Sequence, residues 1–173
     1  ASGGRAREER GIDPDVSGTG DRVGSLVGLL EDGNVTGCYA EGGAVSGSHT
    51  VGGLVGWNWA GTIADCYAIV SVSGYEEVGG LVGRKGYTYW RGAFPGEIFR
   101  CYSAGIVSGD SRVGGLIGYS YVGQVSSCFW DIETSGQPDS DGGIGKTTAE
   151  MQTADTFLEA GWDFVDETQN GTE

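Results

Sequence analysis

Aromatic and basic side chains gather in one part of the sequence, where they could bind a ligand by stacking. The segment "GWNWAG" at residues 56–61 aligns with "GYSYVG" at residues 118–123, and a longer segment, "RKGYTYWRGAFPGEIF", lies between them at residues 84–99. Exposed aromatic rings beside arginine suit stacking against a sugar or a partner protein. The alternative interpretation is that the longer segment folds back over the tryptophans and forms a small core of its own. The candidate binding residues are Trp57, Trp59, Tyr87, Tyr89, Trp90, Arg91, Phe94, Tyr119 and Tyr121.

An acidic segment near the start of the chain could hold calcium. The stretch "DPDVSGTGD" at residues 13–21 places oxygen ligands at alternate positions and a glycine at the sixth, as a calcium-binding loop does. The twelfth position is Gly24, where such a loop needs a bidentate glutamate. Asp13, Asp15 and Asp21 therefore form a weak calcium candidate, and a solvated acidic loop is the alternative.

The four cysteines lie about one repeat apart. Zinc sites need closely spaced ligands such as CxxC, so this spacing argues against zinc. Stacked neighbours about 4.8 Å apart fall within the Cα range of a disulfide, but their parallel Cβ vectors do not suit one. A buried column of thiols is the favoured interpretation, with disulfides as the alternative that an oxidising compartment would support. The residues concerned are Cys38, Cys66, Cys101 and Cys128.

Other motifs do not combine into a catalytic site. His49 is the single histidine, and no serine and aspartate recur with it at a fixed spacing. The acidic pairs at 31–32 and 76–77 are sequence neighbours rather than two carboxyl groups facing one bond. "GGIGKTT" at residues 142–148 lacks the first glycine of a phosphate-binding loop, since Ser140 stands there. We expect a non-enzymatic protein with no cofactor other than calcium.

The elements that must position these residues come from an internal repeat. The words "VGGLVG" at residues 51–56 return at residues 78–83 and, as "VGGLIG", at residues 113–118, and "VGSLVG" at residues 23–28 precedes them. Repeats begin 28, 27 and 35 residues apart, and the third carries an eight-residue insertion before its cysteine. Units of short β-branched runs separated by glycine cannot bury a core alone, but stacked coils can. The sequence predicts an all-β fold, a parallel β-solenoid of about four coils of 27–35 residues with a short helical C-terminal cap.

Aligned repeats predict columns that run along the stack. The first column should be apolar and point inward, and the cysteine column lies three positions later, so a corner must separate them if both face the core. Asp65 and Arg100 share the corner column, and Glu77 and Arg112 share another, so each pair should form an exposed ion pair between coils. The first column is Val35, Ile63, Ile98 and Val125; an outward aromatic column is Tyr39, Tyr67, Tyr102 and Phe129; an inward column of small residues is Ala40, Ala68 and Ser103, and Trp130 ends it.

Charge divides the chain and limits its partners. The net charge is −14, and residues 131–173 hold 11 acidic side chains against a single lysine. We expect no nucleic-acid partner and no membrane span, because no apolar run approaches 18 residues. Threonines at 147–148 and 153 should begin two short helices in the acidic end. The expected organisation is a polar arm at 1–15, repeats at 16–130 and an acidic cap at 131–173.

The units "VGGLVGWNWAGTIADCYAIVSVSG" and "VGGLIGYSYVGQVSSCFW" resemble the GLUG repeat, and the tail that begins "CFWDIETSGQPDSDGG" is similar to the segment that often closes GLUG arrays. That resemblance implies a bacterial or archaeal surface or secreted protein, as in adhesin-like chains and some immunoglobulin A peptidases. It implies an extracellular or cell-surface location and a structural or adhesive role, with a distant alternative as a non-catalytic part of a larger peptidase. Because the basic start opposes the acidic tail, we expect head-to-tail association into a filament, with itself or other surface proteins as partners and glycan as a further candidate.

Overall fold

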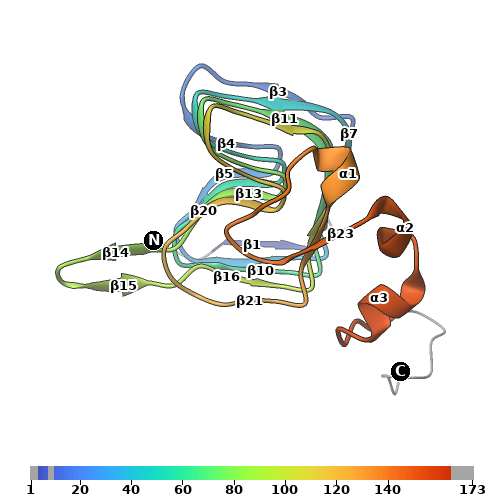
Figure 1. The fold of residues 1–173 in the computed structure, drawn as a ribbon. Coiled ribbons are helices and arrows are strands. Elements are labelled where there is room, and N and C mark those ends of the chain that lie inside the picture. Colours follow the sequence, from blue (N-terminus) through green and yellow to red (C-terminus); the bar gives the residue numbers. More distant parts are fainter. Residues whose placement is uncertain (1–3, 8–9, 165–173) are drawn as a thin grey trace.

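The computed structural model describes residues 4–7 and 10–164, which wind into a stack of parallel coils (Figure 1). Equivalent strands of successive coils pair in parallel along each wall, as a β-solenoid requires, and in the second wall some coils contribute two short strands in place of one long strand. The first wall contains β1 (Gly4–Arg7), β6 (Gly33–Thr36), β10 (Thr62–Ala64), β16 (Glu97–Phe99) and β21 (Val125–Ser126). The second contains β2 (Arg10–Ile12), β3 (Asp15–Ser17), β7 (Tyr39–Ser46), β11 (Tyr67–Ser73), β17 (Tyr102–Ser103), β18 (Val107–Ser108), β22 (Phe129–Asp131) and β23 (Ile144–Lys146).

Two further walls fold inward and form a notch. One contains β4 (Asp21–Gly24), β8 (His49–Gly52), β12 (Glu76–Gly79) and β19 (Ser111–Gly114). The other contains β5 (Val27–Leu30), β9 (Val55–Asn58), β13 (Val82–Lys85) and β20 (Ile117–Ser120). In each coil the chain runs toward the centre of the stack, bends sharply and returns beside itself (Figure 1). The bend carries a leucine into the core, where Leu54, Leu81 and Leu116 are fully buried.

The notch explains the repeated glycines. A Cβ atom on Gly52 would lie 2.0 Å from the carbonyl oxygen of Val55, across the bend of the same coil. One on Gly53 would lie 2.1 Å from the carbonyl oxygen of Gly80 in the next coil, and one on Gly56 would lie 2.6 Å from that of Gly28 in the preceding coil. All three glycines of "VGGLVG" are therefore required where backbone meets backbone. Ser25, which replaces the middle glycine in the first coil, donates its hydroxyl to the Gly53 carbonyl at 2.6 Å.

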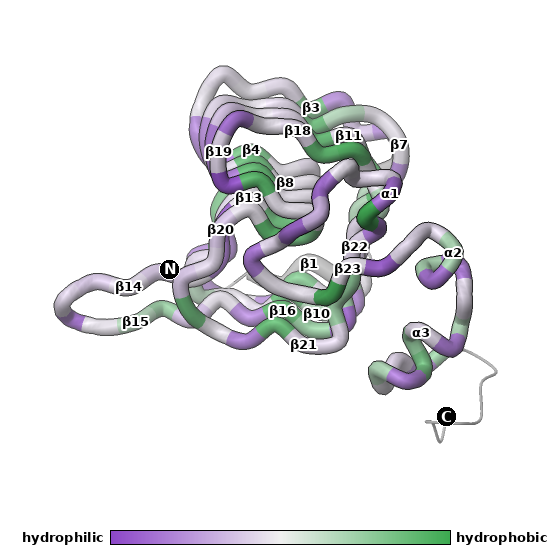
Figure 2. Tube along the Cα trace, in the orientation of Figure 1, coloured by the Kyte–Doolittle hydropathy of each residue, from purple (hydrophilic) through white to green (hydrophobic). Residues whose placement is uncertain are grey.

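The predicted columns and corner are confirmed. Ile63 pairs in register with Val35 and Ile98, and Figure 2 shows apolar residues concentrated along the stacked strands. The corner between this column and the cysteines has positive φ in every coil, from 46° to 66°. Tyr39, Tyr67 and Tyr102 form the expected outward ladder, with successive ring centroids 4.9 Å apart. Phe129 differs from the prediction: it is buried, because Phe157 of the cap packs edge-on against it.

The two ends of the stack are built differently. At the start, residues 4–7 and 10–12, which the sequence assigned to a polar arm, form β1 and β2 and pair with β6 and β7. In this pairing Ala6 takes the register of Val35, and Gly11 takes the register of Ala40. At the other end, α1 (Ile132–Ser135), α2 (Thr148–Met151) and α3 (Ala154–Leu158) form the helical cap, and Thr147 and Glu150 form a capping box at the start of α2.

Candidate binding groove

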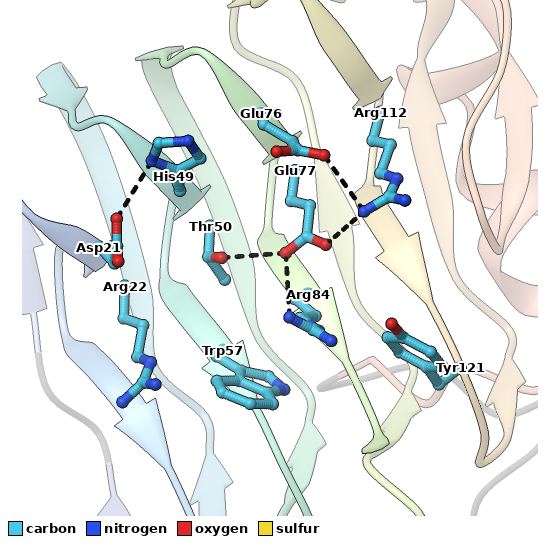
Figure 3. Close-up of a pocket in the computed structure, with 10 residues that line it drawn as sticks. All are labelled: Asp21, Arg22, His49, Thr50, Trp57, Glu76, Glu77, Arg84, Arg112 and Tyr121. Atoms are coloured by element: carbon cyan, nitrogen blue, oxygen red, sulfur yellow. Dashed lines mark hydrogen bonds and ion pairs between the residues drawn. The ribbon is translucent and has the colours of Figure 1, made fainter. Parts of the chain in front are cut away.

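A polar groove lies at the mouth of the notch and runs along the stack. The glycines hold the two notch strands together deep inside, so their outward side chains face one another only at the mouth. The groove has a volume of about 400 Å³ and receives side chains from all four coils (Figure 3). Its lining residues are Asp21, Arg22, His49, Thr50, Trp57, Glu76, Glu77, Arg84, Arg112 and Tyr121.

A buried carboxylate organises the groove. Glu77 accepts hydrogen bonds from the Thr50 hydroxyl at 3.0 Å and from Arg112 at 3.0 Å, and Arg84 lies 3.5 Å from the same carboxylate. Arg112 also contacts Glu76 at 3.2 Å. The predicted pairing of Glu77 with Arg112 is confirmed, but the expected exposure is wrong for Glu77, whose side chain is only 6% exposed. Burial arises because the opposite notch strand covers it, and two arginines and a hydroxyl then stabilise its charge.

Arginine and aromatic side chains alternate along the groove. Arg22 and Arg84 lie over Trp57, with guanidinium carbons 4.9 Å and 4.5 Å from the ring centroid. Arg84 also lies 4.7 Å from the centroid of Tyr121, so it is held between two rings. The Nε atom of Arg84 is buried and finds no acceptor among the described residues. Stacking fixes these guanidinium groups in place and leaves their edges as preformed hydrogen-bond donors.

Sequence reasoning missed this ladder, although its signal was present. Trp57, Arg84 and Tyr119 occupy one register position in β9, β13 and β20, so aligning the repeats column by column places them together. The insertion in the third repeat hid the alignment, because "RKGYTYW" was assigned to the insertion rather than to the coil. A second column of positive φ was also missed: Arg22, Thr50, Glu77 and Arg112 all have φ between 51° and 66°.

His49 lies in the groove without a catalytic arrangement. Its Nδ1 atom lies 3.1 Å from Asp21 and 2.8 Å from the Ser48 hydroxyl. A catalytic triad uses both ring nitrogens, one toward the nucleophile and the other toward the carboxylate. Here serine and aspartate share one nitrogen, so histidine cannot relay a proton between them.

The insertion forms a hairpin that supports both interpretations of the aromatic residues. Strands β14 (Tyr87–Tyr89) and β15 (Gly92–Phe94) project away from the stack (Figure 1). At its base Trp59 packs edge-on against Tyr87 and Phe94, which is the small side core proposed as the alternative. At its tip Trp90 is 83% exposed, and Arg91 lies 4.2 Å from its ring centroid.

The remaining aromatic candidates join these two groups. Tyr87 contacts Trp57, Tyr89 and Tyr121, and Tyr89 stacks on Phe94. Tyr119 packs edge-on against Tyr121 with centroids 4.7 Å apart. The structure therefore brings all nine candidate residues to one edge, but only Tyr89, Trp90 and Tyr121 among the aromatics are strongly exposed.

A buried lysine anchors the hairpin. The Nζ atom of Lys85, which is fully buried, donates to the carbonyl oxygens of Val122 and Gly123 at 2.8 Å and of Gly96 at 3.2 Å. Burial lowers the pKa of Lys85 to about 8, and the charge of Glu97 opposes this shift. Lys85 thus ties the return of the hairpin to the loop of the next coil, a role that its sequence position did not indicate.

The calcium candidates do not form a cluster. Asp15 lies on β3 and Asp21 lies on β4, where it pairs with His49, while the side chain of Asp13 lies near Gly42. Among residues 4–7 and 10–164, no group of three or more histidine, cysteine, aspartate or glutamate side chains is arranged to hold a metal ion.

The cysteines form a column of buried thiols inside the corner. All four are at most 1% exposed. In three of them the sulfur lies 3.0–3.1 Å from the carbonyl oxygen two residues earlier, for example Cys66 from Ala64. Burial raises the pKa of Cys101 well above its usual value, so this thiol is held uncharged.

Comparison with known proteins agrees with this architecture. A family model described as the GLUG motif matches residues 19–46 and 47–73. The chain is also similar to a protein of Evansella cellulosilytica named as a Gly-rich membrane protein, with 35% identity over 116 residues, which is 66% of this chain and 10% of that protein. The chain therefore spans a small part of this relative. No solved structure was found to match, and no helix in the described part of the chain is long and apolar enough to cross a membrane. The two successive coils at residues 19–46 and 47–73 are therefore GLUG repeats, and the third coil pairs in register with the second of them and the fourth coil with the third.

Proposed function

We propose that this chain is a non-catalytic module of a longer cell-surface protein, in which its stacked coils act as a rigid structural or adhesive element. Two observations support this role. The chain contains GLUG repeats, and it resembles a tenth of the length of a Gly-rich membrane protein.

The observation that carries the proposal is the difference between the two edges of the stack. At the C-terminal edge, Ser140 accepts from the amides of Leu116 and Ile117, and Asp141 accepts from the amide of Ser120. These side chains satisfy backbone amides that would otherwise be free to pair with a further coil. At the N-terminal edge, β4 and β5 each pair on one side only within the described residues. An open edge of this kind is a template for further strands.

The covered C-terminal edge limits the growth of the expected filament. Head-to-tail growth needs both edges, so displacement of the loop around residues 137–146 must precede it. We propose that the open edge takes further coils or another copy, and that the cap keeps assemblies short.

Duplication of one coil tests the structural role. Repeating residues 47–73 within the chain should add one coil that pairs with equivalent strands on both sides, and it should raise the thermal midpoint. An insert with the same residues in scrambled order is the control. If the duplicated and scrambled inserts lower stability equally, the modular stacking proposal is wrong.

Light scattering tests the role of the cap. The double variant Ser140→Ala and Asp141→Ala removes four hydrogen bonds from the edge and should form larger, concentration-dependent assemblies than the unmodified chain. A double variant that stays folded and monomeric at high concentration would contradict end-to-end stacking.

The exposed hairpin tip favours a second candidate role in recognition of a partner protein or glycan. Trp90 is 83% exposed, which is unusual for so large a ring and typical of a binding anchor. Trp90→Ala should abolish binding to cells or to arrayed glycans, whereas Tyr75→Ala, which removes a 57% exposed ring outside the hairpin, should not. Equal binding by both variants would remove this candidate.

A further inference from the structure

We propose that the groove at the notch mouth binds a short acidic oligosaccharide, with its chain lying along the axis of the stack and its carboxylates on Arg22 and Arg84. This site is separate from the structural role proposed above, and its failure would leave that role intact.

The shape of the groove selects an elongated ligand. Its lining begins with Asp21 and Arg22 on the first coil and ends with Arg112 and Tyr121 on the fourth. Three steps of about 4.8 Å between paired strands give a length of about 14 Å. With a volume of about 400 Å³ the groove can hold a few linked sugar rings in a row.

The arginines select a ligand that carries anions. No described carboxylate forms an ion pair with Arg22, and Arg84 lies 3.5 Å from Glu77 while its Nε atom finds no acceptor. Both guanidinium groups lie over the Trp57 ring, with their carbons 4.9 Å and 4.5 Å from its centroid (Figure 3). Planar, prepositioned guanidinium groups bind carboxylates with two parallel hydrogen bonds and lose little entropy in doing so. They lie two coils apart, so the acidic groups should recur about 10 Å along the ligand.

The other groups favour a sugar over a peptide. His49 and Glu76 place an imidazole and a carboxylate on two successive coils, which suits the many hydroxyl groups of a sugar. Tyr121, 42% exposed, adds a ring surface. An extended peptide usually binds by pairing its backbone with a free strand edge. Here β8 and β12 already pair on both sides, so no free edge lines the centre of the groove.

The charge of the whole chain limits ligand length. A net charge of −14 repels a long polyanion that extends beyond the groove. Only a short oligomer whose acidic groups fit within the groove should bind well.

Titration calorimetry with defined ligands tests the site. The probes are trimers of several uronic acids, with the methyl ester of each trimer as a neutral match. At least one acid trimer should bind the full chain, and its ester should bind about tenfold more weakly or not at all. Arg22→Gln, a change at an exposed side chain, should weaken binding by about tenfold. Arg84→Gln should weaken it further, and Arg100→Gln, which removes a positive charge that pairs with Asp65 outside the groove, should leave it unchanged.

Three results would overturn the proposal. The first is that no acid trimer binds at millimolar concentration. The second is that ester and acid bind equally, or that Arg22→Gln has no effect. The third is that a glutamate-rich peptide of equal charge binds as tightly as the trimer, which would assign the groove to proteins. Because Arg22 is exposed, its variant keeps the test valid even if Arg84→Gln fails to fold.

Discussion

Replacing Gly52 by alanine should destabilise the chain more than replacement of almost any surface residue. The added Cβ atom would lie 2.0 Å from the Val55 carbonyl oxygen and 2.7 Å from the Gly83 amide nitrogen, whereas ordinary contact begins at 3.4 Å. The two notch strands must therefore separate by about 1.4 Å. Both contacting atoms belong to the backbone, so no side chain can rotate away to relieve the clash. Overpacking typically costs 1–3 kcal/mol, and this rigid case should reach about 3 kcal/mol or more.

Thermal unfolding followed by circular dichroism and tryptophan fluorescence measures this effect. For a chain of this length, about 3 kcal/mol lowers the midpoint by roughly 6–12 °C. Gly20→Ala is the matched control, because nothing lies within 4 Å of its added Cβ atom and its φ is not positive. The control should stay within about 1 kcal/mol of the parent and could be slightly more stable. If Gly52→Ala unfolds at the same midpoint as Gly20→Ala, the notch glycines are not required by backbone contact.

Three further predictions concern a buried lysine, an ion pair and the cysteine column. Lys85 has a lowered pKa, so the unfolded chain binds more protons than the folded chain between pH 8 and 10.5, and the contribution of this residue to stability should rise through that window by up to about 3 kcal/mol. Urea unfolding from pH 7 to 10 should show a growing difference between the unfolding free energies of the parent and of Lys85→Met. A constant difference would contradict the lowered pKa. Asp65 and Arg100 form a half-exposed bidentate pair at 2.6 Å and 2.9 Å, so Asp65→Asn should cost at most about 1 kcal/mol and less at high salt; a salt-independent loss of several kcal/mol in a double-mutant cycle would show that the pair is not solvent-screened. Cys38, Cys66, Cys101 and Cys128 should resist alkylation in the native chain and all react in denaturant, as counted by intact mass, because each is at most 1% exposed; rapid native labelling, or a mass two hydrogens lower for each bridge, would rule out the buried thiol column.

Sequence reasoning worked where one residue type repeats at the same position in every coil. Val35, Ile63 and Ile98 share size and polarity, so their column and its inward direction follow from alternation along a strand. The corner follows as well, because an odd step between two inward columns needs a change of direction. Both inferences depend only on residues that are neighbours along one strand or in register between coils.

The notch and its groove could not be predicted in the same way. Whether Glu77 is buried depends on how closely two strands of different walls approach, and the repeat pattern contains no distance between walls. Arg84 and Trp57 differ in residue type although they share a column, so no repeated residue type indicated that they stack on each other. β1 was missed for a related reason: its polar composition concealed the fact that Ala6 falls in register with Val35.

The hairpin of the third coil implies that this fold can change its surface without changing its stack. The chain leaves the stack where the Gly86 amide donates to the Asn58 carbonyl and returns where the Glu97 amide donates to the Gly61 carbonyl. Ile98 still pairs with Ile63, so the insertion leaves the register of the next wall intact. Residues 87–95 are thus a natural grafting position, where loops of different length and chemistry could be exchanged on a constant scaffold. Large arrays of such coils could then display a different loop on each coil, and diversify by local insertion while their backbone architecture stays the same.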